Sequence, residues 1–295
     1  MSKPLKIAVD LMGGDYAPLS TAQAVIAVAL ESPDIVFQVI AVPHIISQYF
    51  ATKPSNIVVF PVESAVTMSM TAAEAAKLRQ SSSMGKMIEL VQTGDADVGV
   101  SAGNTAALMS LSYLMLKMRD GVRRPAILSS YSYKGKKAYI TDLGANISPK
   151  PEDFVSNAFM AVEESGKDQP TIGLMNVGVE ETKGTETIKL AANLLEASEL
   201  NYVGFIEGCD ILPSPVDIVL CDGFVGNCMT KLLESMISEA KGWGSDPLCV
   251  PVLHSAALFT GLNGYIYKAH GSCKTDRFRD VLLDVIIHAK KRIFA

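Results

Sequence analysis

The chain has few of the residues from which metal sites, disulfide frameworks and nucleic-acid surfaces are built. Its 295 residues include only five cysteines and four histidines, and no two cysteines are spaced as CxxC. An odd number of scattered thiols fits a reducing compartment better than a disulfide framework or a zinc site. The net charge of −5 argues against a general nucleic-acid binder. We therefore expect a cytoplasmic protein with no metal and no nucleic-acid partner.

Two familiar nucleotide-binding motifs are also missing. The sequence contains no GxxxxGK[ST] and no GxGxxG after a strand-like run, which disfavours P-loop enzymes and Rossmann dehydrogenases. We expect no cofactor, and any phosphate site must be assembled in another way. Long uncharged stretches at Val98–Leu116 and Pro247–Tyr267 are interrupted by polar or helix-breaking residues. These stretches therefore predict buried strand–loop–helix units rather than membrane spans.

What the sequence does contain is a recurring strand–loop–helix junction. Five apolar, strand-like runs end at Asp10, Ser101, Asp142, Met175 and Cys221, and each is followed by a loop rich in Gly, Asn or Asp. In an open parallel sheet such loops all leave one edge, where ligands bind. Gly allows close backbone approach, and a helix N-terminus offers free N–H groups to an anion. This pattern predicts an enzyme whose site is built by several loops around a phosphorylated or acyl-phosphate-like ligand.

Strand-like and helix-like segments alternate along nearly the whole chain. Strands are predicted at Leu5–Val9, Ile35–Val42, Ile57–Pro61, Val98–Ser101, Ala126–Ser130, Ala138–Thr141, Ile172–Met175, Val203–Ile206, Ile218–Cys221 and Tyr265–Lys268. Helices are predicted at Pro18–Leu30, Ile45–Phe50, Thr71–Arg79, Met84–Gln92, Asn104–Met118, Pro151–Ser165, Thr185–Ala197, Val225–Ala240, Val252–Thr260 and Asp276–Arg292. The alternation predicts an α/β fold, a mostly parallel sheet with helices on both faces. We expect one domain over residues 1–295, or two lobes with an antiparallel turn at Lys134–Ala138.

Lys183 and two asparagines are the sharpest candidates for chemistry. Lys183 precedes a predicted helix, where its charge adds to the helix dipole, but it also fits a solvated loop lysine paired with Glu180 or Glu181. Asn104 and Asn227 each lie at a predicted helix start after a strand. Such an Asn is often only an N-cap, but its side-chain N–H can also bind a developing oxyanion.

Other polar residues at the strand ends have a structural and a functional interpretation. Asp10, Asp15, Asp142 and Asp222 could bind a metal with phosphate or could cap loops, and we favour the structural role. Cys221 is favoured as a small packing residue over a nucleophile, which would need a base or a positive field. His270 stands apart from the other histidines because it follows the end of a strand.

Eight loop segments, taken in order, resemble one known family, the bacterial phosphate acyltransferases of phospholipid synthesis. The segments are Val9–Pro18, Ser82–Met84, Ser101–Thr105, Arg124–Ala126, Asp142–Asn146, Glu181–Gly184, Asp222–Asn227 and Ala269–Ser272. Each segment alone is a weak signal, but eight in order are highly specific.

The resemblance implies a reaction, a fold and a set of partners. In this reaction a long-chain acyl–acyl-carrier-protein and inorganic phosphate give acyl phosphate and free carrier protein. It implies a homodimer with a three-layer αβα fold similar to phosphotransacetylases and to isocitrate and isopropylmalate dehydrogenases. It also implies peripheral attachment at the inner membrane face, where a glycerol-3-phosphate acyltransferase takes the acyl phosphate for phospholipid synthesis.

The resemblance also assigns roles to residues. Lys183 and Asn227 match the family's catalytic candidates, Lys183 holding the phosphate or the thioester oxyanion and Asn227 donating to the same centre. The residues expected to bind phosphate or substrate are Asp10, Gly13, Gly14, Ser83, Ser101, Asn104, Thr105, Asp142, Asn146, Asp222, Gly226 and His270. Because phosphate is itself the nucleophile, the reaction needs positioning and oxyanion stabilisation rather than a catalytic triad.

The chain departs from the family pattern after Asn227. Family members carry a longer helical hairpin there, so we expect a shortened helical segment near residues 231–260. Leu232, Leu233, Met236, Ile237, Ala240 and Trp243 trace one helical face, which favours a packed or dimer-buried surface over a lipid anchor. Two alternatives stay open: a phosphate acyltransferase that uses short-chain acyl-CoA, and a catalytically weak phospho-ligand sensor on the same fold. Arginines at 119, 123, 124, 277 and 279, with Lys274, are the candidates for docking an acidic carrier protein.

Overall fold

The chain divides into two compact units. The computed structural model describes residues 3–240 and 250–293. The first unit contains residues 3–119 and 255–293, so both ends of the chain contribute to it. The second unit contains the described residues between 120 and 254.

The first unit is built on a mostly parallel sheet. Its strands lie in the order β3-β2-β1-β4-β12-β11, and only β11 runs antiparallel to its neighbour β12. Their bounds are β1 Lys6–Asp10, β2 Val36–Ala41, β3 Ile57–Pro61, β4 Val98–Ser101, β11 Ala257–Thr260 and β12 Tyr265–Lys268. Asp10 of β1, Ser101 of β4 and Lys268 of β12 are in register, so the loops that follow these three strands leave the sheet side by side.

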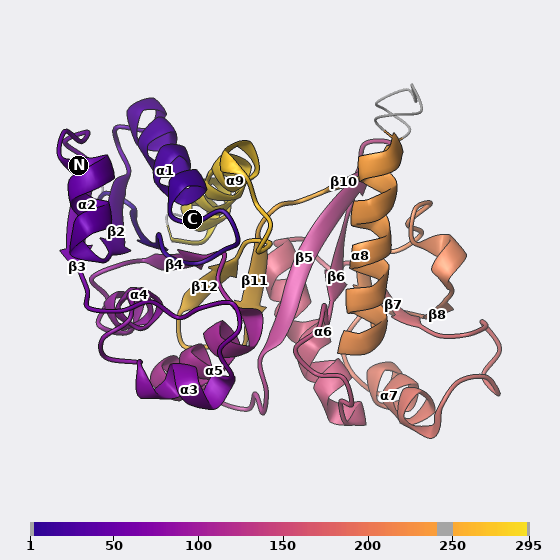
Figure 1. Cartoon of the computed structure of the whole chain (residues 1–295). Coiled ribbons are helices and arrows are strands. Elements are labelled where there is room, and N and C mark those ends of the chain that lie inside the picture. Colours follow the sequence, from indigo (N-terminus) through magenta and orange to yellow (C-terminus); the bar gives the residue numbers. More distant parts are fainter. Residues whose placement is uncertain (1–2, 241–249, 294–295) are drawn as a thin grey trace. The chain divides into compact units, whose positions relative to one another are not determined.

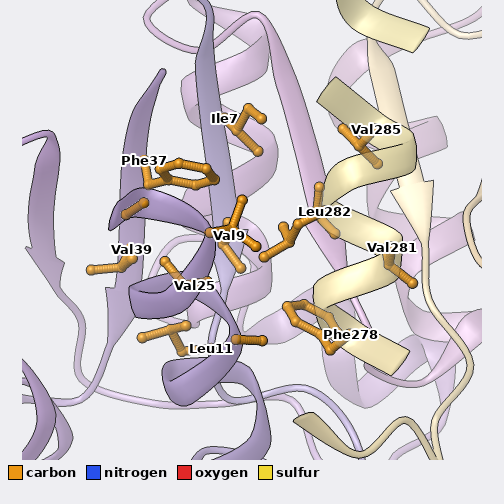
Figure 2. Close-up of a cluster of buried hydrophobic side chains, with 14 of the residues drawn as sticks. Ile7, Val9, Leu11, Val25, Phe37, Val39, Phe278, Val281, Leu282 and Val285 are labelled. Atoms are coloured by element: carbon orange, nitrogen blue, oxygen red, sulfur yellow. The ribbon is translucent and has the colours of Figure 1, made fainter. Parts of the chain in front are cut away.

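Helices cover both faces of this sheet (Figure 1). Their bounds are α1 Leu19–Glu31, α2 Pro43–Phe50, α3 Ala72–Lys77, α4 Ser83–Gln92, α5 Thr105–Leu116 and α9 Thr275–Ile293. Helices α1 and α9 pack together on one face, and α4 lies on the other with α5 against it. Figure 2 shows Val9 and Phe37 of the sheet meeting Val25 of α1 and Leu282 of α9 in the buried core. This apolar layer fixes the sheet on which the loops are mounted.

The second unit combines a hairpin with a short parallel sheet. The strands follow the order β5-β6-β9-β7-β8, with β10 paired to β5. Their bounds are β5 Ala126–Tyr133, β6 Lys136–Thr141, β7 Ile172–Met175, β8 Tyr202–Ile206, β9 Ile218–Leu220 and β10 Val252–Leu253. Strands β6, β9, β7 and β8 are parallel, whereas β5 and β6 are antiparallel. The helices are α6 Pro151–Ser165, α7 Glu186–Glu196 and α8 Gly223–Ala240, with a 3₁₀ turn at Gly208–Asp210.

Local signals in the sequence account for several of these elements. The predicted capping box at the start of α3 is confirmed: the Thr71 N–H donates to Glu74 at 2.7 Å and the Glu74 N–H donates to the Thr71 hydroxyl at 3.3 Å. The antiparallel turn predicted at Lys134–Ala138 is the β5–β6 hairpin, in which both Lys134 and Gly135 have positive φ. The predicted α/β fold with a mostly parallel sheet and flanking helices is confirmed.

The predicted helix at Val252–Thr260 is wrong. The structure has two short strands there, β10 paired with β5 and β11 paired with β12. An apolar run of this length has no periodicity that distinguishes a strand from a helix. Whether it forms strands depends on the sheet edges with which it can pair. Of the segment near 231–260 that was expected to be a shortened helical segment, residues 231–240 belong to α8. Residues 241–249 lie outside the described residues.

Long apolar helices are not a feature of the described residues. Among them, no helix combines the length and the hydrophobicity that crossing a bilayer requires.

Candidate active site

Three loops of the second unit leave one edge of its sheet. Strand β9 pairs in parallel with β6 on one side and with β7 on the other. The segments that follow these strands therefore start next to one another: residues 142–146 after β6, residues 176–184 after β7, and residues 221–222 with the first turns of α8 after β9. Lys183 and Asn227, which are far apart in sequence, lie on or directly after loops of adjacent strands.

Asp142 organises the loop after β6. Its side chain is buried and accepts five hydrogen bonds: from the backbone N–H groups of Ile127, Gly144, Ala145 and Asn146 and from the Asn146 amide, at 2.7–3.2 Å. Burial raises the pKa of this carboxyl, whereas the N–H donors favour its ionised form. With this set of partners, the Asp142 carboxylate holds the loop in shape.

The N-terminus of α8 lies directly against the Asp142 loop. The Gly223 N–H donates to the Asn146 carbonyl at 2.8 Å, and a Cβ atom at Gly226 would overlap the Asp142 carbonyl oxygen. The Asp222 carboxylate accepts the Val225 N–H at 2.8 Å, as an N-cap does. Asn146 is tied down as well, since its amide donates to Pro125 O and to Asp142. In the structure, the Asn146 amide and one Asp222 oxygen hold the loops, and Gly226 lets α8 pack closely; the roles of these residues toward phosphate stay predictions.

Asn227 lies one turn into α8, half-buried and facing the Asp142 loop. Its Nδ2 donates to the Leu143 carbonyl at 3.3 Å, a long hydrogen bond. A Cβ atom on Gly144 would lie 3.1 Å from that nitrogen, and Gly144 has a φ of +128°, which only glycine adopts readily. The second amide hydrogen of Asn227 has no acceptor within residues 3–240 and 250–293. The side chain therefore keeps a donor that a ligand can take.

Lys183 is exposed on the loop between β7 and α7. Asn176 closes this loop by donating to the Lys183 carbonyl at 3.3 Å, and Thr185 caps α7 by accepting the Ile188 N–H. In the described part of the chain, the ammonium forms no ion pair with Glu180, Glu181 or any other acid. Lys183 is therefore a solvated loop lysine, as the structural interpretation expects, but it is not paired with Glu180 or Glu181, and its role in chemistry stays a prediction.

Cys221 is a packing residue, as its sequence context favours. The thiol is buried and lies 3.5 Å from the Thr141 carbonyl. Burial raises its pKa, and the nearby carboxylates of Asp142 and Asp222 raise it further. A thiol in this environment stays protonated and is a poor nucleophile.

A second loop cluster, in the first unit, surrounds Asp10. The Asp10 carboxylate is buried and accepts hydrogen bonds from the Ser101 hydroxyl at 2.8 Å and the Met12 N–H at 3.1 Å. Burial raises its pKa, and these bonds lower it in part. The Ser101 hydroxyl also accepts the Gly103 N–H at 3.0 Å. The loops after β1 and β4 are therefore joined through one buried carboxylate.

Glycines let these loops approach each other closely. A Cβ atom on Gly13 would lie 2.6 Å from the Gly103 nitrogen, which no side chain tolerates. Gly14 has a φ of +115°, and the Asp15 N–H donates to the Gly271 carbonyl at 2.8 Å. The loops after β1, β4 and β12 thus form one compact cluster.

The remaining predicted residues of the first unit lie around this cluster. The Asn104 amide donates to the carbonyls of Met68 and Met70 at 2.8 and 2.9 Å, while its oxygen caps α5. Thr105 is the exposed first residue of α5, and Ser83 is the buried first residue of α4. In the structure the Asn104 side chain pins a loop and caps a helix, and its role toward phosphate stays a prediction.

The strand end at β12 adds one residue that the sequence analysis did not single out. Lys268 is buried, and its ammonium donates to the Ala102 carbonyl at 3.3 Å and to the Ala269 carbonyl. It thereby joins the loops after β4 and β12. His270 is exposed, with Nδ1 2.8 Å from the Ser272 hydroxyl. The sequence signal for the loop-joining role of Lys268 is a lysine in the last position of an apolar strand. Such a lysine is buried, so its ammonium needs partners within the protein.

Metal-ligand geometry is not found in either cluster. Across residues 3–240 and 250–293, no three His, Cys, Asp or Glu side chains converge as a metal ion requires. The candidate residues thus divide between two clusters, one in each unit. Lys183 and Asn227 both lie in the second unit, after the paired strands β7 and β9.

Comparison with known proteins identifies the family. The family model described as "Fatty acid synthesis protein" matches residues 5–242. A "Phosphate acyltransferase" from Pseudomonas savastanoi pv. phaseolicola is 34% identical over 99% of this chain and 95% of its own length. Another, from Pseudomonas syringae pv. tomato, is 33% identical over 99% of this chain and 94% of its own.

The fold is also found in solved structures. A branched-chain phosphotransacylase from Enterococcus faecalis superposes with a TM-score of 0.68 over 97% of this chain and 99% of its own, at 16% identity. At such low identity this likeness shows the fold alone, and it agrees with the expected similarity to phosphotransacetylases. From the family match, and from relatives that are one-third identical over nearly the full length, we conclude that the chain belongs to the phosphate acyltransferases of fatty acid and phospholipid synthesis and is an enzyme of the acyltransferase class.

Proposed function

We propose that this protein transfers a long-chain acyl group from acyl–acyl-carrier-protein to inorganic phosphate. A phosphate oxygen attacks the thioester carbonyl carbon, and the carbonyl oxygen becomes a tetrahedral oxyanion. When this intermediate collapses, the carbon–sulfur bond breaks and the thiolate leaves with the carrier protein, to be protonated by water. The products are acyl phosphate and free carrier protein, so the step needs no covalent enzyme intermediate.

One observation carries this proposal: Lys183, on the loop after β7, and Asn227, in the first turns of α8 after the adjacent parallel strand β9, keep donors that no group in the described residues takes. In the proposed reaction the Lys183 ammonium neutralises the phosphate, and the Asn227 amide donates to the oxyanion. Hydrogen-bond donors that point toward the developing charge typically make the largest single contribution to transition-state stabilisation in such reactions.

The first test is direct. Wild-type protein mixed with palmitoyl–acyl-carrier-protein and phosphate is expected to yield acyl phosphate, trapped as the hydroxamate with hydroxylamine. Lys183→Ala should lower the rate roughly 100-fold or more, whereas Lys189→Ala on the neighbouring helix α7 should leave it near wild type. A Lys183→Ala variant with full output would refute the assigned role.

The same assay separates the proposed function from its rivals. Faster turnover of acetyl- or butyryl-CoA than of palmitoyl–acyl-carrier-protein would identify a short-chain phosphate acyltransferase. Phosphate binding without hydroxamate from any donor would identify a sensor on the same fold.

The acidic carrier protein is proposed to dock through local basic groups. Arg123 lies 3.9 Å from Glu152 and 3.8 Å from Asp153, and Arg279 lies 2.7 Å from Glu31, so these two arginines are already paired. Lys274 lies over the Tyr16 ring at 5.7 Å and is better placed to meet an incoming carboxylate. Reversing the charge of Lys274 and Arg277 should raise the Michaelis constant for the carrier substrate; an unchanged constant would remove this surface from the proposal.

A homodimer is proposed on α8. Leu233 is buried, whereas Leu232 and Met236, four residues apart, are 62% and 40% exposed on that helix. Trp243 and the side chain of Ala240, which the sequence places on the same face, lie outside the described residues. A second copy of this chain would cover the exposed apolar face. Attachment at the inner membrane face, beside a glycerol-3-phosphate acyltransferase, stays part of the proposal.

A further inference from the structure

Each of the three segments that follow β6, β7 and β9 exposes an apolar side chain. Ile147 follows the β6 loop and is 68% exposed; Phe224 opens α8 and is 61% exposed. On the β7 loop, Val177 is 78% exposed and Val179 is 58% exposed. Single exposed apolar residues are ordinary on protein surfaces, but here every loop that surrounds the candidate polar groups carries one.

Ile147 and Phe224 come from backbone segments that lie side by side. The residues that precede them, Asn146 and Gly223, are joined by a backbone hydrogen bond of 2.8 Å. Phe224 also lies three residues before Asn227 on α8, so the two side chains share a face of the helix. Phe224 therefore lies within one helical turn of the amide proposed to bind the oxyanion.

Val177 and Val179 are close to Lys183. The buried residue Gly178 lies between them, and the Lys183 Cγ would be 3.2 Å from a Cβ atom placed on that glycine. The base of the Lys183 side chain thus lies near the backbone between the two valines, where a Glu180 carboxylate oxygen also lies 2.7 Å from the same Cβ position. The β7 loop presents two apolar side chains beside charged ones.

We propose that Ile147, Phe224, Val177 and Val179 form the surface that contacts the hydrocarbon chain of the acyl donor. The inference rests on the proposed function. An acyl group held by its carbonyl oxygen at Asn227 must extend its chain across the neighbouring surface, and these four side chains are that surface. Apolar walls around a few placed polar groups are the usual anatomy of a small-molecule site. The four residues are then determinants of chain-length preference.

The test compares donors of different length. We would measure kcat/KM for butyryl- and palmitoyl–acyl-carrier-protein with Phe224→Ser, Ile147→Ser and the double Val177→Ser/Val179→Ser variant. Each methylene in full apolar contact is worth about a fourfold gain in binding. Removing one of the apolar contacts should therefore lower the palmitoyl-to-butyryl ratio of kcat/KM values about tenfold. Leu190→Ser, a 45% exposed position on α7 away from these loops, is the matched control and should keep the wild-type ratio.

The outcomes separate the inference from the function it rests on. Active wild-type protein whose variants lose both donors equally would overturn the acyl-chain surface alone. A change in oligomeric state of these variants on sizing would also overturn it, because a second copy would then cover the patch. Wild-type protein without turnover on any donor would overturn the proposed function, and this inference with it.

Discussion

Gly226 of α8 lies against the main-chain carbonyl of Asp142, so closely that a Cβ atom would overlap the oxygen. Gly223, one turn earlier, has the same relation to Asn146, whose carbonyl oxygen would be 2.8 Å from its Cβ. These two contacts place the start of α8 against the loop after β6. The position of Asn227, one residue beyond Gly226, depends on them.

Gly226→Ala should therefore impair catalysis through position. The new methyl group must push α8 away from the Asp142 loop, which typically costs about 1–3 kcal/mol of overpacking strain and moves the Asn227 amide. We expect a lower Tm and a fall in kcat of about tenfold or more, because small displacements of an oxyanion donor are costly. Gly208→Ala is the control, since its Cβ would meet no atom within 4 Å. Equal activity of the two variants would argue against this packing.

Asn227→Ala removes the donor itself. Loss of one oxyanion donor typically lowers kcat about 100- to 1000-fold, with a smaller change in KM, because the bond strengthens in the transition state. Asn193→Ala, at an exposed position on α7, should behave as wild type. A variant whose KM rises while kcat stays unchanged would assign Asn227 to ground-state binding instead.

Lys268→Met tests the tie between the loops after β4 and β12. The Lys268 ammonium donates to Ala102 and Ala269, so its loss should loosen both loops. We expect faster amide hydrogen exchange in peptides that cover residues 101–105 and 269–273. Lys136→Met, at an exposed position on β6, supplies the comparison. Unchanged exchange in both segments would show that the loops hold their positions without Lys268.

Asp217 should give the second unit a pH-dependent stability. Burial raises the pKa of this carboxyl, but hydrogen bonds from Lys167 and from the Thr171 N–H and hydroxyl outweigh it and leave the pKa below its ordinary value. A lowered pKa stabilises the fold above the unfolded-state pKa of about 3.9, and this contribution is lost as pH falls through the folded-state pKa.

The Asp217→Asn variant reports this contribution. The Asp217 carboxyl is partly exposed, so we expect the variant protein to be less stable than wild type by no more than about 1 kcal/mol at pH 7. The difference in unfolding free energy between wild type and variant should stay constant down to about pH 5 and close below pH 4. Urea unfolding at each pH measures this difference. Asp168→Asn, at a nearby exposed position, should show no such closing gap. A gap that widens in acid would reverse the sign of the argument.

Leu232→Glu tests the proposed dimer. If a second copy covers Leu232 and Met236, a buried carboxylate at this position should shift the protein from dimer to monomer in sedimentation equilibrium. Ser235→Glu adds the same charge at an exposed position of the same helix and should keep the wild-type mass. A Leu232→Glu protein with the wild-type mass would place the interface elsewhere.

Some structural features could be predicted from the local sequence, and others depend on contacts between distant segments. The capping box at Thr71 and Glu74 and the hairpin turn at Lys134 and Gly135 involve residues a few positions apart, so their pattern is readable along the chain. The Val252–Thr260 segment has no such local signal, because its strands form only where β5 and β12 offer an edge. The proximity of the backbone at Ile147 and Phe224 could not be predicted from the pattern either, since it depends on a hydrogen bond between residues 146 and 223.

The sequence by itself determined the alternation of strands and helices, the family, and the residues around which chemistry was sought, because propensity, turn chemistry and ordered motifs are local properties. Only the tertiary structure decided which polar groups are already engaged. Asp142 and Asn104 use their hydrogen-bonding groups to hold loops, whereas Lys183 and one Asn227 hydrogen stay available within the described residues. The physical reason is that a side chain's partners come from segments distant in sequence, and burial makes each polar group take those partners first.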